Sequence, residues 1–170
     1  MNQNNRLSHP DPSFSPLGKP SSYISHYSPE LLFPISRKGK RDEINVPEEL
    51  PFYGFDTWNA YEVSWLNPRG KPVVAVAQFN ISCSSENIIE SKSFKLYLNS
   101  LNNTAFESMG EVEAILKRDV QLALNGEVTV RLFSLDELAG VTLTAFEGEL
   151  LDDYDIECDT YTINSDFLTA

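Results

Sequence analysis

The clearest regularity in the sequence is an alternation of apolar and polar residues from Trp58 to Leu66, which predicts a half-buried β-strand. The residues expected to share one side of this strand are Tyr61, Val63 and Trp65. The tetrapeptide Asn67-Pro68-Arg69-Gly70 has the composition of a tight turn, and the β-branched apolar run Val73–Phe79 follows it. Together these segments predict an antiparallel hairpin.

A helical period replaces the alternation in the middle of the chain. Residues Ser91–Leu101 place three apolar side chains on one helix face, namely Phe94, Leu98 and Leu101. Ser108 and Glu111 have the spacing of a capping box, in which each side chain accepts a hydrogen bond from the other residue's amide, and a second apolar helix face follows. Asn125-Gly126 ends this helix, and we expect Gly126 to adopt the left-handed conformation common at that position.

Strand periodicity returns after the second helix. Val128, Val130 and Leu132 alternate with polar residues, the segment Val141–Ala145 does the same, and Tyr161–Ile163 forms a last short extended piece. The resulting order of strand, strand, helix, helix, strand, strand predicts an α+β fold in which both helices cover one face of an antiparallel sheet. Partial burial of the other face by a second copy of the chain would also remove the exposed sheet edges.

Residues 1–50 differ from the remainder because proline and serine are frequent among them. We interpret this part as an extended arm with one helical turn near Ser28–Phe33, where Ser28 precedes Pro29 as an N-cap. The basic run 37–41 is interpreted as a solvated loop rather than a phosphate or nucleic-acid patch. The domain prediction is therefore an arm at 1–50 and one folded module at 51–170.

The charge balance changes which partners are expected. The chain of 170 residues carries 13 Lys and Arg against 25 Asp and Glu, a net charge of −12. Such a charge argues against direct binding to nucleic acid or to anionic membranes. Because the sequence has no signal-peptide core and no apolar run of membrane-spanning length, we expect a cytoplasmic protein without a membrane partner.

The residues that most often carry chemistry are few. The two histidines, His9 and His26, both lie in the arm, so neither a Cys-His pair nor a metal site is predicted. Cys158 lies in an acidic stretch that we interpret as a solvated connection. Cys83 follows a predicted strand, and both a reactive role and a bystander role remain open for it.

The densest group of functional side chains lies at the start of the first helix. Glu90 and Ser91 stand where free backbone amides attract an anion, and Lys92 and Lys95 are spaced to share one helix face. Two interpretations follow from this pattern. It is either a phosphate-binding helix start or a capped helix with ordinary surface lysines.

This segment also resembles a known family. The run ESKSFKLYLNS at Glu90–Ser100, together with Leu50–Gly54, Trp58 and Glu62–Asn67, resembles the NADPH-dependent 7-cyano-7-deazaguanine reductases. The resemblance extends over most of residues 17–168 and corresponds to the N-terminal half of the two-module form. It implies the tunnelling fold, whose copies assemble into a barrel. It also implies a nitrile-to-amine reduction that serves the queuosine modification of tRNA.

The resemblance implies specific roles for four residues. Ile89, Glu90 and Ser91 would contact the deazaguanine substrate, and Ser91 and Lys92 would contact NADPH. The family's nucleophilic cysteine and proton-donating aspartate belong to the C-terminal half, beyond Ala170, so no catalytic residue is expected in this chain. We therefore expect a fragment, a truncated product or one subunit of a split enzyme, acting as a homodimer or with a C-terminal module.

Two other functions stay open on the sequence. Because the cysteine–aspartate pair is absent, the chain could serve as a non-catalytic assembly or ligand-binding module of the same fold. As a third hypothesis, the chain could be a pterin-type or zinc cyclohydrolase relative of the same fold. The scarcity of histidine argues against it.

Overall fold

The computed structural model describes residues 12–20, 24–138, 144–162 and 164–167. The chain divides into two units, residues 1–139 and residues 140–170, which are considered separately. The first unit holds every strand and α-helix of the described residues, and the first element described in it is a short 3-10 turn, Pro12–Phe14. In the second unit, the described residues form one 3-10 turn, Ser165–Phe167.

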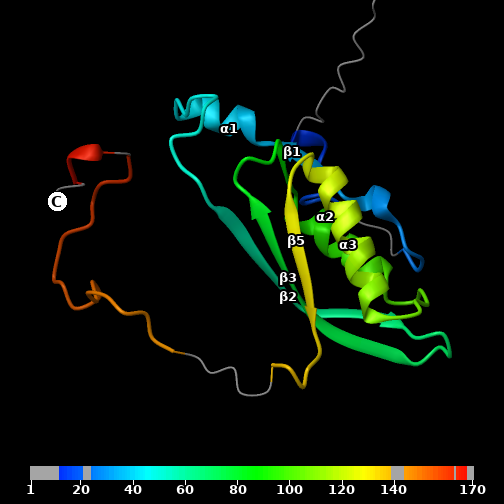
Figure 1. Cartoon of the computed structure of the whole chain (residues 1–170). Helices are drawn as coiled ribbons and strands as arrows, with labels where there is room; N and C mark the ends of the chain where they lie inside the picture. The colour runs from blue at the N-terminus through cyan, green and yellow to red at the C-terminus, as the bar shows by residue number, and fades with distance from the viewer. Residues whose placement is uncertain (1–11, 21–23, 139–143, 163, 168–170) are drawn as a thin grey trace, which may run out of the picture. The chain divides into compact units, whose positions relative to one another are not determined.

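The main sheet of the first unit has three antiparallel strands in the order β2-β3-β5 (Figure 1). Strand β2 spans Phe55–Leu66, β3 spans Pro72–Ser82 and β5 spans Val128–Phe133. The turn between β2 and β3 is closed by the Gly70 amide, which donates to the Asn67 carbonyl at 2.8 Å. The predicted hairpin and the strand after the second helix are confirmed.

A β-bulge in β2 reverses which residues face the helices. Ala60 pairs with Ala77, but the next pair is Val63 with Ala75, so β2 contains one extra residue between them. Val63 and Trp65 are buried as predicted, whereas Tyr61 is 77% exposed. The prediction that Tyr61 shares their side is wrong, because strict alternation holds only where no residue is inserted.

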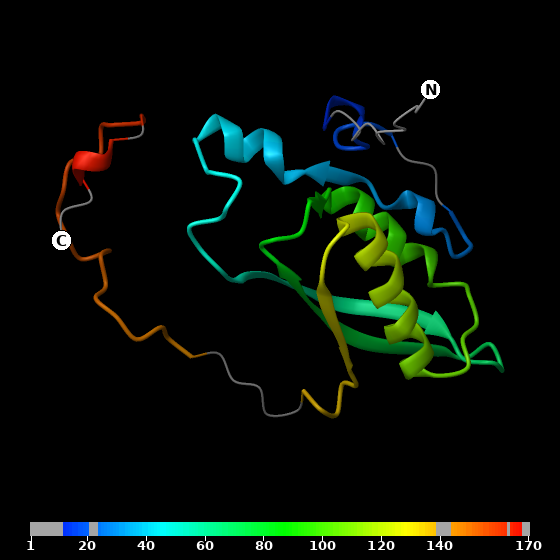
Figure 2. The same cartoon turned by 45° about the horizontal axis from the view of Figure 1, so that its top comes forward.

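Two helices cover one face of this sheet, as Figures 1 and 2 show. Helix α2 spans Ser91–Ser100 and α3 spans Met109–Leu124, which confirms both predicted helices and the α+β class. The core lies between the helices and the sheet. Its fully buried members include Tyr97 and Leu101 near α2, Val112, Leu116 and Val120 on α3, and Ala75, Ala77 and Phe79 on β3.

Both ends of α3 differ in detail from the sequence prediction. Ser108 accepts the Glu111 amide at 3.1 Å as expected, but the Glu111 carboxylate accepts from the residue before Ser108. Asn125 rather than Gly126 adopts the left-handed conformation, with φ of 45°. A Cβ on Gly126 would lie 2.6 Å from Ser85 Cα, so this glycine is needed for close backbone approach.

The described part of the proline-rich arm contains more regular secondary structure than the sequence predicts. The helical turn is present as the 3-10 helix Pro29–Leu31, and β1 (Pro34–Ser36) then pairs with β4 (Asn87–Ile89) in a two-stranded antiparallel sheet. The basic run forms helix α1, Arg37–Glu43, instead of a loop. Its lysines pair within one turn, Lys38 with Asp42 and Lys40 with Glu43, which favours the helix.

A buried carboxylate ties the arm to both long helices. Asp119 on α3 is 5% exposed and accepts hydrogen bonds from the Tyr97 hydroxyl at 2.7 Å and the Tyr27 hydroxyl at 2.5 Å. Arg118 donates from Nε to Asp119 and from Nη2 to the Tyr27 hydroxyl. We call these four side chains the Asp119 cluster. It joins Tyr27 of the arm to Asp119, which lies 92 residues further along the chain.

The Asp119 cluster predicts a stability loss in alkali. Burial, followed by the hydrogen bond to Asp119, raises the pKa of Tyr27 to about 12, and the same causes raise the pKa of Tyr97. Because these tyrosines ionise near their ordinary pKa of about 10 only in the unfolded chain, their contribution to the free energy of unfolding is fully present below that pH and is lost as the pH rises above it. Urea unfolding across this range checks the prediction. Tyr27→Phe should flatten the decline, and an unchanged slope would contradict it.

Part of the predicted strand order lies outside the described residues. Residues 139–143 hold most of the predicted strand Val141–Ala145, and its described residues, 144 and 145, are not in a strand. Tyr161 and Thr162, from the last predicted extended piece, are also not in a strand. Among the described helices, none is long and apolar enough to cross a membrane.

Candidate functional site

The start of α2 is capped by its own preceding residue. Glu90 is 5% exposed, and its carboxylate accepts the amide of Lys92 at 2.8 Å and the amide of Ser93 at 2.7 Å. Of the two interpretations that the sequence left open, the structure supports the capped helix, because the Glu90 carboxylate already occupies the position that an external anion would take. Any phosphate near this helix would have to be bound by side chains.

Phe33, which immediately precedes β1, and Ser93 hold Glu90 in place. The Glu90 amide donates to the Phe33 carbonyl at 2.9 Å, and the Ser93 hydroxyl donates to the Glu90 carbonyl at 2.7 Å. The same hydroxyl accepts the Phe33 amide at 3.0 Å. Ile89, at the end of β4, is 2% exposed and pairs with Pro34. These contacts fix the backbone on both sides of the helix start.

Ser91 and the two lysines point to different surroundings. Ser91 and Lys95 are exposed and line a cavity against β2. Lys92 is half-buried, and its ammonium donates to the Pro16 carbonyl at 3.0 Å and to the Lys19 carbonyl. Of the four residues singled out for binding, only Ser91 lines the cavity, while Ile89 and Glu90 form its structural support.

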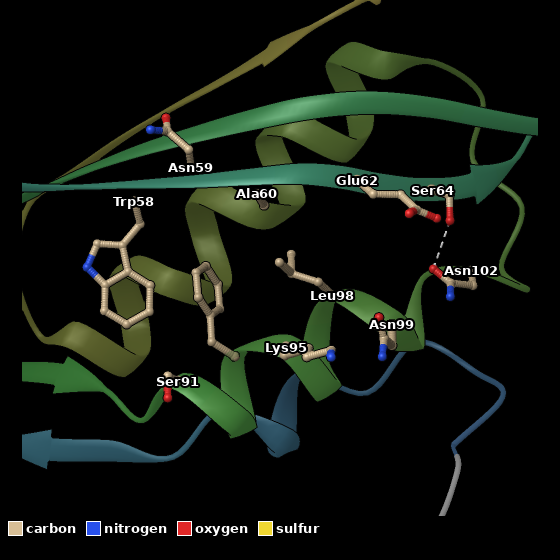
Figure 3. Close-up of a pocket in the computed structure, with 11 residues that line it drawn as sticks. Trp58, Asn59, Ala60, Glu62, Ser64, Ser91, Lys95, Leu98, Asn99 and Asn102 are labelled. Carbon is tan, nitrogen blue, oxygen red and sulfur yellow. Dashed lines mark hydrogen bonds between the residues drawn. The ribbon is translucent and has the colours of Figure 1, made fainter. Parts of the chain in front are cut away.

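The cavity beside Ser91 has a volume of about 360 Å³ and lies between α2 and the edge strand β2 (Figure 3). Its lining residues are Trp58, Asn59, Ala60, Glu62 and Ser64 from β2, Ser91, Phe94, Lys95, Leu98 and Asn99 from α2, and Asn102 beyond it. The bulge in β2 brings Trp58 and Ala60 to this side of the sheet.

The lining combines an aromatic wall with opposite charges. Trp58 packs edge-on against Phe94, with ring centroids 5.6 Å apart. Glu62 and Lys95 both line the cavity, and neither has a hydrogen-bond or ion-pair partner among the residues that the structure describes. A carboxylate acceptor, an ammonium donor and an aromatic ring suit a planar molecule with both donors and acceptors on its edge.

Some of this lining was not foreseen as functional from the sequence. Glu62 and Ser64 belong to a segment that resembles the family, but no binding role was predicted for them, and Asn102 was not singled out at all. Ser64 donates to Asn102 at 3.0 Å, which closes one end of the cavity. No local signal shows that they lie together, because their proximity arises from the packing of β2 against α2.

The cysteines lie elsewhere. Cys83 is half-buried, lines a different cavity beside Phe52 and Tyr53, and its carbonyl accepts a hydrogen bond from Arg41. Cys158 is exposed in the second unit. Within residues 12–20, 24–138, 144–162 and 164–167, no group of three or more metal-ligating side chains is assembled.

Comparison with known protein families gives a direct match. Residues 23–132 match a family model described as nitrile reductase, 7-cyano-7-deazaguanine reductase, N-terminal. The match includes β1, the main sheet strands up to β5, both long helices and the complete start of α2.

Curated relatives agree with the family match. The chain is 50% identical over 159 residues to an NADPH-dependent 7-cyano-7-deazaguanine reductase of Paraburkholderia phytofirmans, covering 94% of this chain and 58% of the relative. Relatives of the same name from Burkholderia thailandensis and Legionella pneumophila are each 50% identical, with 58% and 55% of their lengths covered. The chain thus spans a little over half the length of the curated relatives it matches.

Proposed function

The chain belongs to the nitrile reductase family of 7-cyano-7-deazaguanine reductases, whose N-terminal part it matches, and from this membership we propose that it takes part in the NADPH-dependent reduction of 7-cyano-7-deazaguanine. The product is 7-aminomethyl-7-deazaguanine, a precursor of the queuosine modification of tRNA. The observation that carries the proposal is the start of α2, where Ser91 lines a cavity suited to a planar heterocycle and has Glu90 and Lys92 as its neighbours in the chain.

Substrate binding is assigned to Ile89, Glu90 and Ser91. A carboxylate has about four lone-pair positions, of which Glu90 uses two for the amides of its own helix. A third faces the Ser91 hydroxyl at 3.4 Å, and the position that remains can accept an N–H group from the edge of a purine-like base. The Ser91 hydroxyl lines the cavity and can donate or accept beside it. The two residues together favour a ligand with several donors on one edge.

Cofactor binding is assigned to Ser91 and Lys92. Because the helix amides are occupied by Glu90, a phosphate of NADPH would be held by the Lys92 ammonium and the Ser91 hydroxyl. Lys92 has three N–H donors and uses two of them on backbone carbonyls, so one is left for an anion. The residues present therefore fit a phosphate-bearing cofactor, which when bound supplies the hydride.

The remaining catalytic groups are assigned to a partner. In the family, a cysteine nucleophile and an aspartate proton donor lie in the C-terminal half, so we propose that this chain works with that module. A homodimer is the other proposed assembly, and it would cover the sheet without supplying those two groups. Support comes from uncovered surface on and beside the main sheet. Phe55 and Tyr61 on edge strand β2 are 67% and 77% exposed, and Val74 on β3 is 41% exposed.

The proposal places the protein in the cytoplasm, where Cys83 and Cys158 stay reduced.

The test is turnover by the assembled enzyme. The chain is combined with the C-terminal half of a curated relative, and NADPH consumption is followed with the nitrile as substrate. We expect two NADPH per nitrile, because a nitrile-to-amine reduction takes four electrons. Lys92→Met should raise the KM for NADPH about tenfold, since it removes a charge-assisted hydrogen bond.

The matched control for that variant is Lys117→Met, which removes an exposed lysine of α3 away from the cavity and should leave the KM unchanged. A folded, complete assembly that consumes no NADPH would reject the proposal.

The second candidate is a non-catalytic ligand-binding or assembly module. It is favoured by the position of the two cysteines, neither of which lines the cavity beside Ser91. If it is correct, the assembled protein should bind 7-cyano-7-deazaguanine in an equilibrium titration without reducing it.

A further inference from the structure

A short turn in the arm lies directly over Lys92. The Lys19 amide donates to the Pro16 carbonyl at 3.1 Å, and Gly18 has φ of 73°, which together define a turn with a glycine at its left-handed position. We call residues 16–19 the strap. The turn depends on Gly18, because a side chain there would strain the backbone although nothing lies within 4 Å of its Cβ position.

Both ends of the strap bind the same ammonium. Lys92 Nζ donates to the Pro16 carbonyl at 3.0 Å and to the Lys19 carbonyl. Two further bonds brace the strap from inside, since the Leu17 amide donates to the Ser15 hydroxyl and the Lys19 ammonium donates to the Ser13 carbonyl. Ser15 is 7% exposed, so this end of the arm is packed rather than loosely attached.

These contacts reduce the conformational entropy that the Lys92 side chain would lose on binding an anion. A free lysine loses much rotamer freedom when it binds an anion, and that loss weakens binding. The strap has already restricted the Lys92 side chain, whereas the exposed Lys95 on the same helix has no such restraint among the described residues. Because the two carbonyls leave one N–H unused, a phosphate can bind without displacing them.

We propose that the strap is a positioning element that holds the Lys92 ammonium at the start of α2 and thereby strengthens binding of a phosphate-bearing ligand. The inference rests on the proposed function in one respect, namely that Lys92 contacts a phosphate of NADPH. The contact between strap and lysine is independent of that role.

The experiment compares two glycine-to-valine variants of the full chain. Gly18→Val should open the strap, because valine disfavours positive φ by enough to shift the equilibrium roughly fivefold to tenfold. Gly70→Val is the matched control, since Gly70 has φ of 79°, open space around its Cβ position and no bond to Lys92. Acylation of Lys92 by a water-soluble succinimidyl ester, followed by mass spectrometry with Lys95 as internal reference, reports how accessible the amine is.

We expect Gly18→Val to raise the rate of Lys92 acylation roughly fivefold and Gly70→Val to leave it unchanged. An equal rate of Lys92 acylation in the two variants would show that the strap does not hold the Lys92 ammonium, and would overturn the proposal. NADPH titration then measures the effect on binding. Gly18→Val should weaken NADPH binding roughly fivefold in the natural chain and have no effect in a Lys92→Met background, because the strap acts only through that lysine.

Other outcomes separate the two proposals. If Gly18→Val exposes Lys92 but leaves NADPH affinity unchanged or higher, the positioning role is rejected. If it weakens binding equally with and without Lys92, the effect is merely structural and the role is again rejected. If the natural chain binds no NADPH while Lys92 acylation still responds to Gly18→Val, the proposed cofactor contact fails and the strap contact is supported.

Discussion

Replacing Asp119 with alanine is expected to lower the free energy of unfolding by about 3 kcal/mol. Tyr97 is fully buried, with 0% of its surface exposed, and its hydroxyl would lose its acceptor. A buried polar group would then be left unpaired. Tyr27 and Arg118 would lose the same partner, so the arm would also be held less firmly. Urea denaturation followed by circular dichroism measures the change.

Two further variants keep this expectation testable. Asp136→Ala removes an exposed carboxylate of the same unit and should cost little. Adding Tyr97→Phe to Asp119→Ala should recover part of the loss, because it removes the orphaned hydroxyl. If Asp119→Ala proved no more destabilising than Asp136→Ala, the Asp119 cluster would not hold the arm as described.

Glu90→Asp is expected to preserve the fold while reducing the kcat/KM of the assembled reductase for the nitrile by about a hundredfold. Aspartate is a favoured N-cap, so the amides of Lys92 and Ser93 keep a carboxylate acceptor. The shorter side chain withdraws that carboxylate from the base, and the loss of a strong charge-assisted hydrogen bond accounts for the effect. Steady-state kinetics with saturating NADPH, paired with thermal unfolding of the chain, measures both effects.

Glu90→Gln separates charge from reach at the same position. Glutamine has the length of glutamate but only one acceptor oxygen, so it should lose part of the cap and part of the substrate affinity. Full turnover in Glu90→Asp, with an intact fold, would show that Glu90 is only a helix cap and would remove it from the proposed site.

Elements whose apolar residues recur with a helix or strand period could be predicted, because the same apolar face that produces the period is the face that packs into the core. The β2–β3 hairpin, α2, α3 and β5 were all foreseen, since each buries one face against a single core. Helix α1 was missed because its support comes from ion pairs within a polar sequence, such as Lys38 with Asp42, rather than from an apolar face. The bulge after Ala60 has no local signal and changed the side on which Tyr61 lies.

For the candidate site, the residue types at the start of α2 and the family they resemble could be read from the chain alone. Glu90, Ser91 and Lys92 are consecutive, so their grouping is a local property. The partners of these residues were not predictable, because Glu90 meets Phe33 and Lys92 meets Pro16 across long separations in the chain. The cavity beside Ser91 is likewise built from β2 and α2, which are distant in sequence.

The boundary between the two kinds of information follows from the range of the interactions. Hydrophobic periodicity, turn composition and helix capping act within a few residues, and they were sufficient for the α+β class and for most elements of the first unit. Pairing of β1 with β4, closure of the strap over Lys92 and burial of Asp119 depend on segments far apart along the chain. Those contacts exist only after the chain has folded, because packing alone brings their members together.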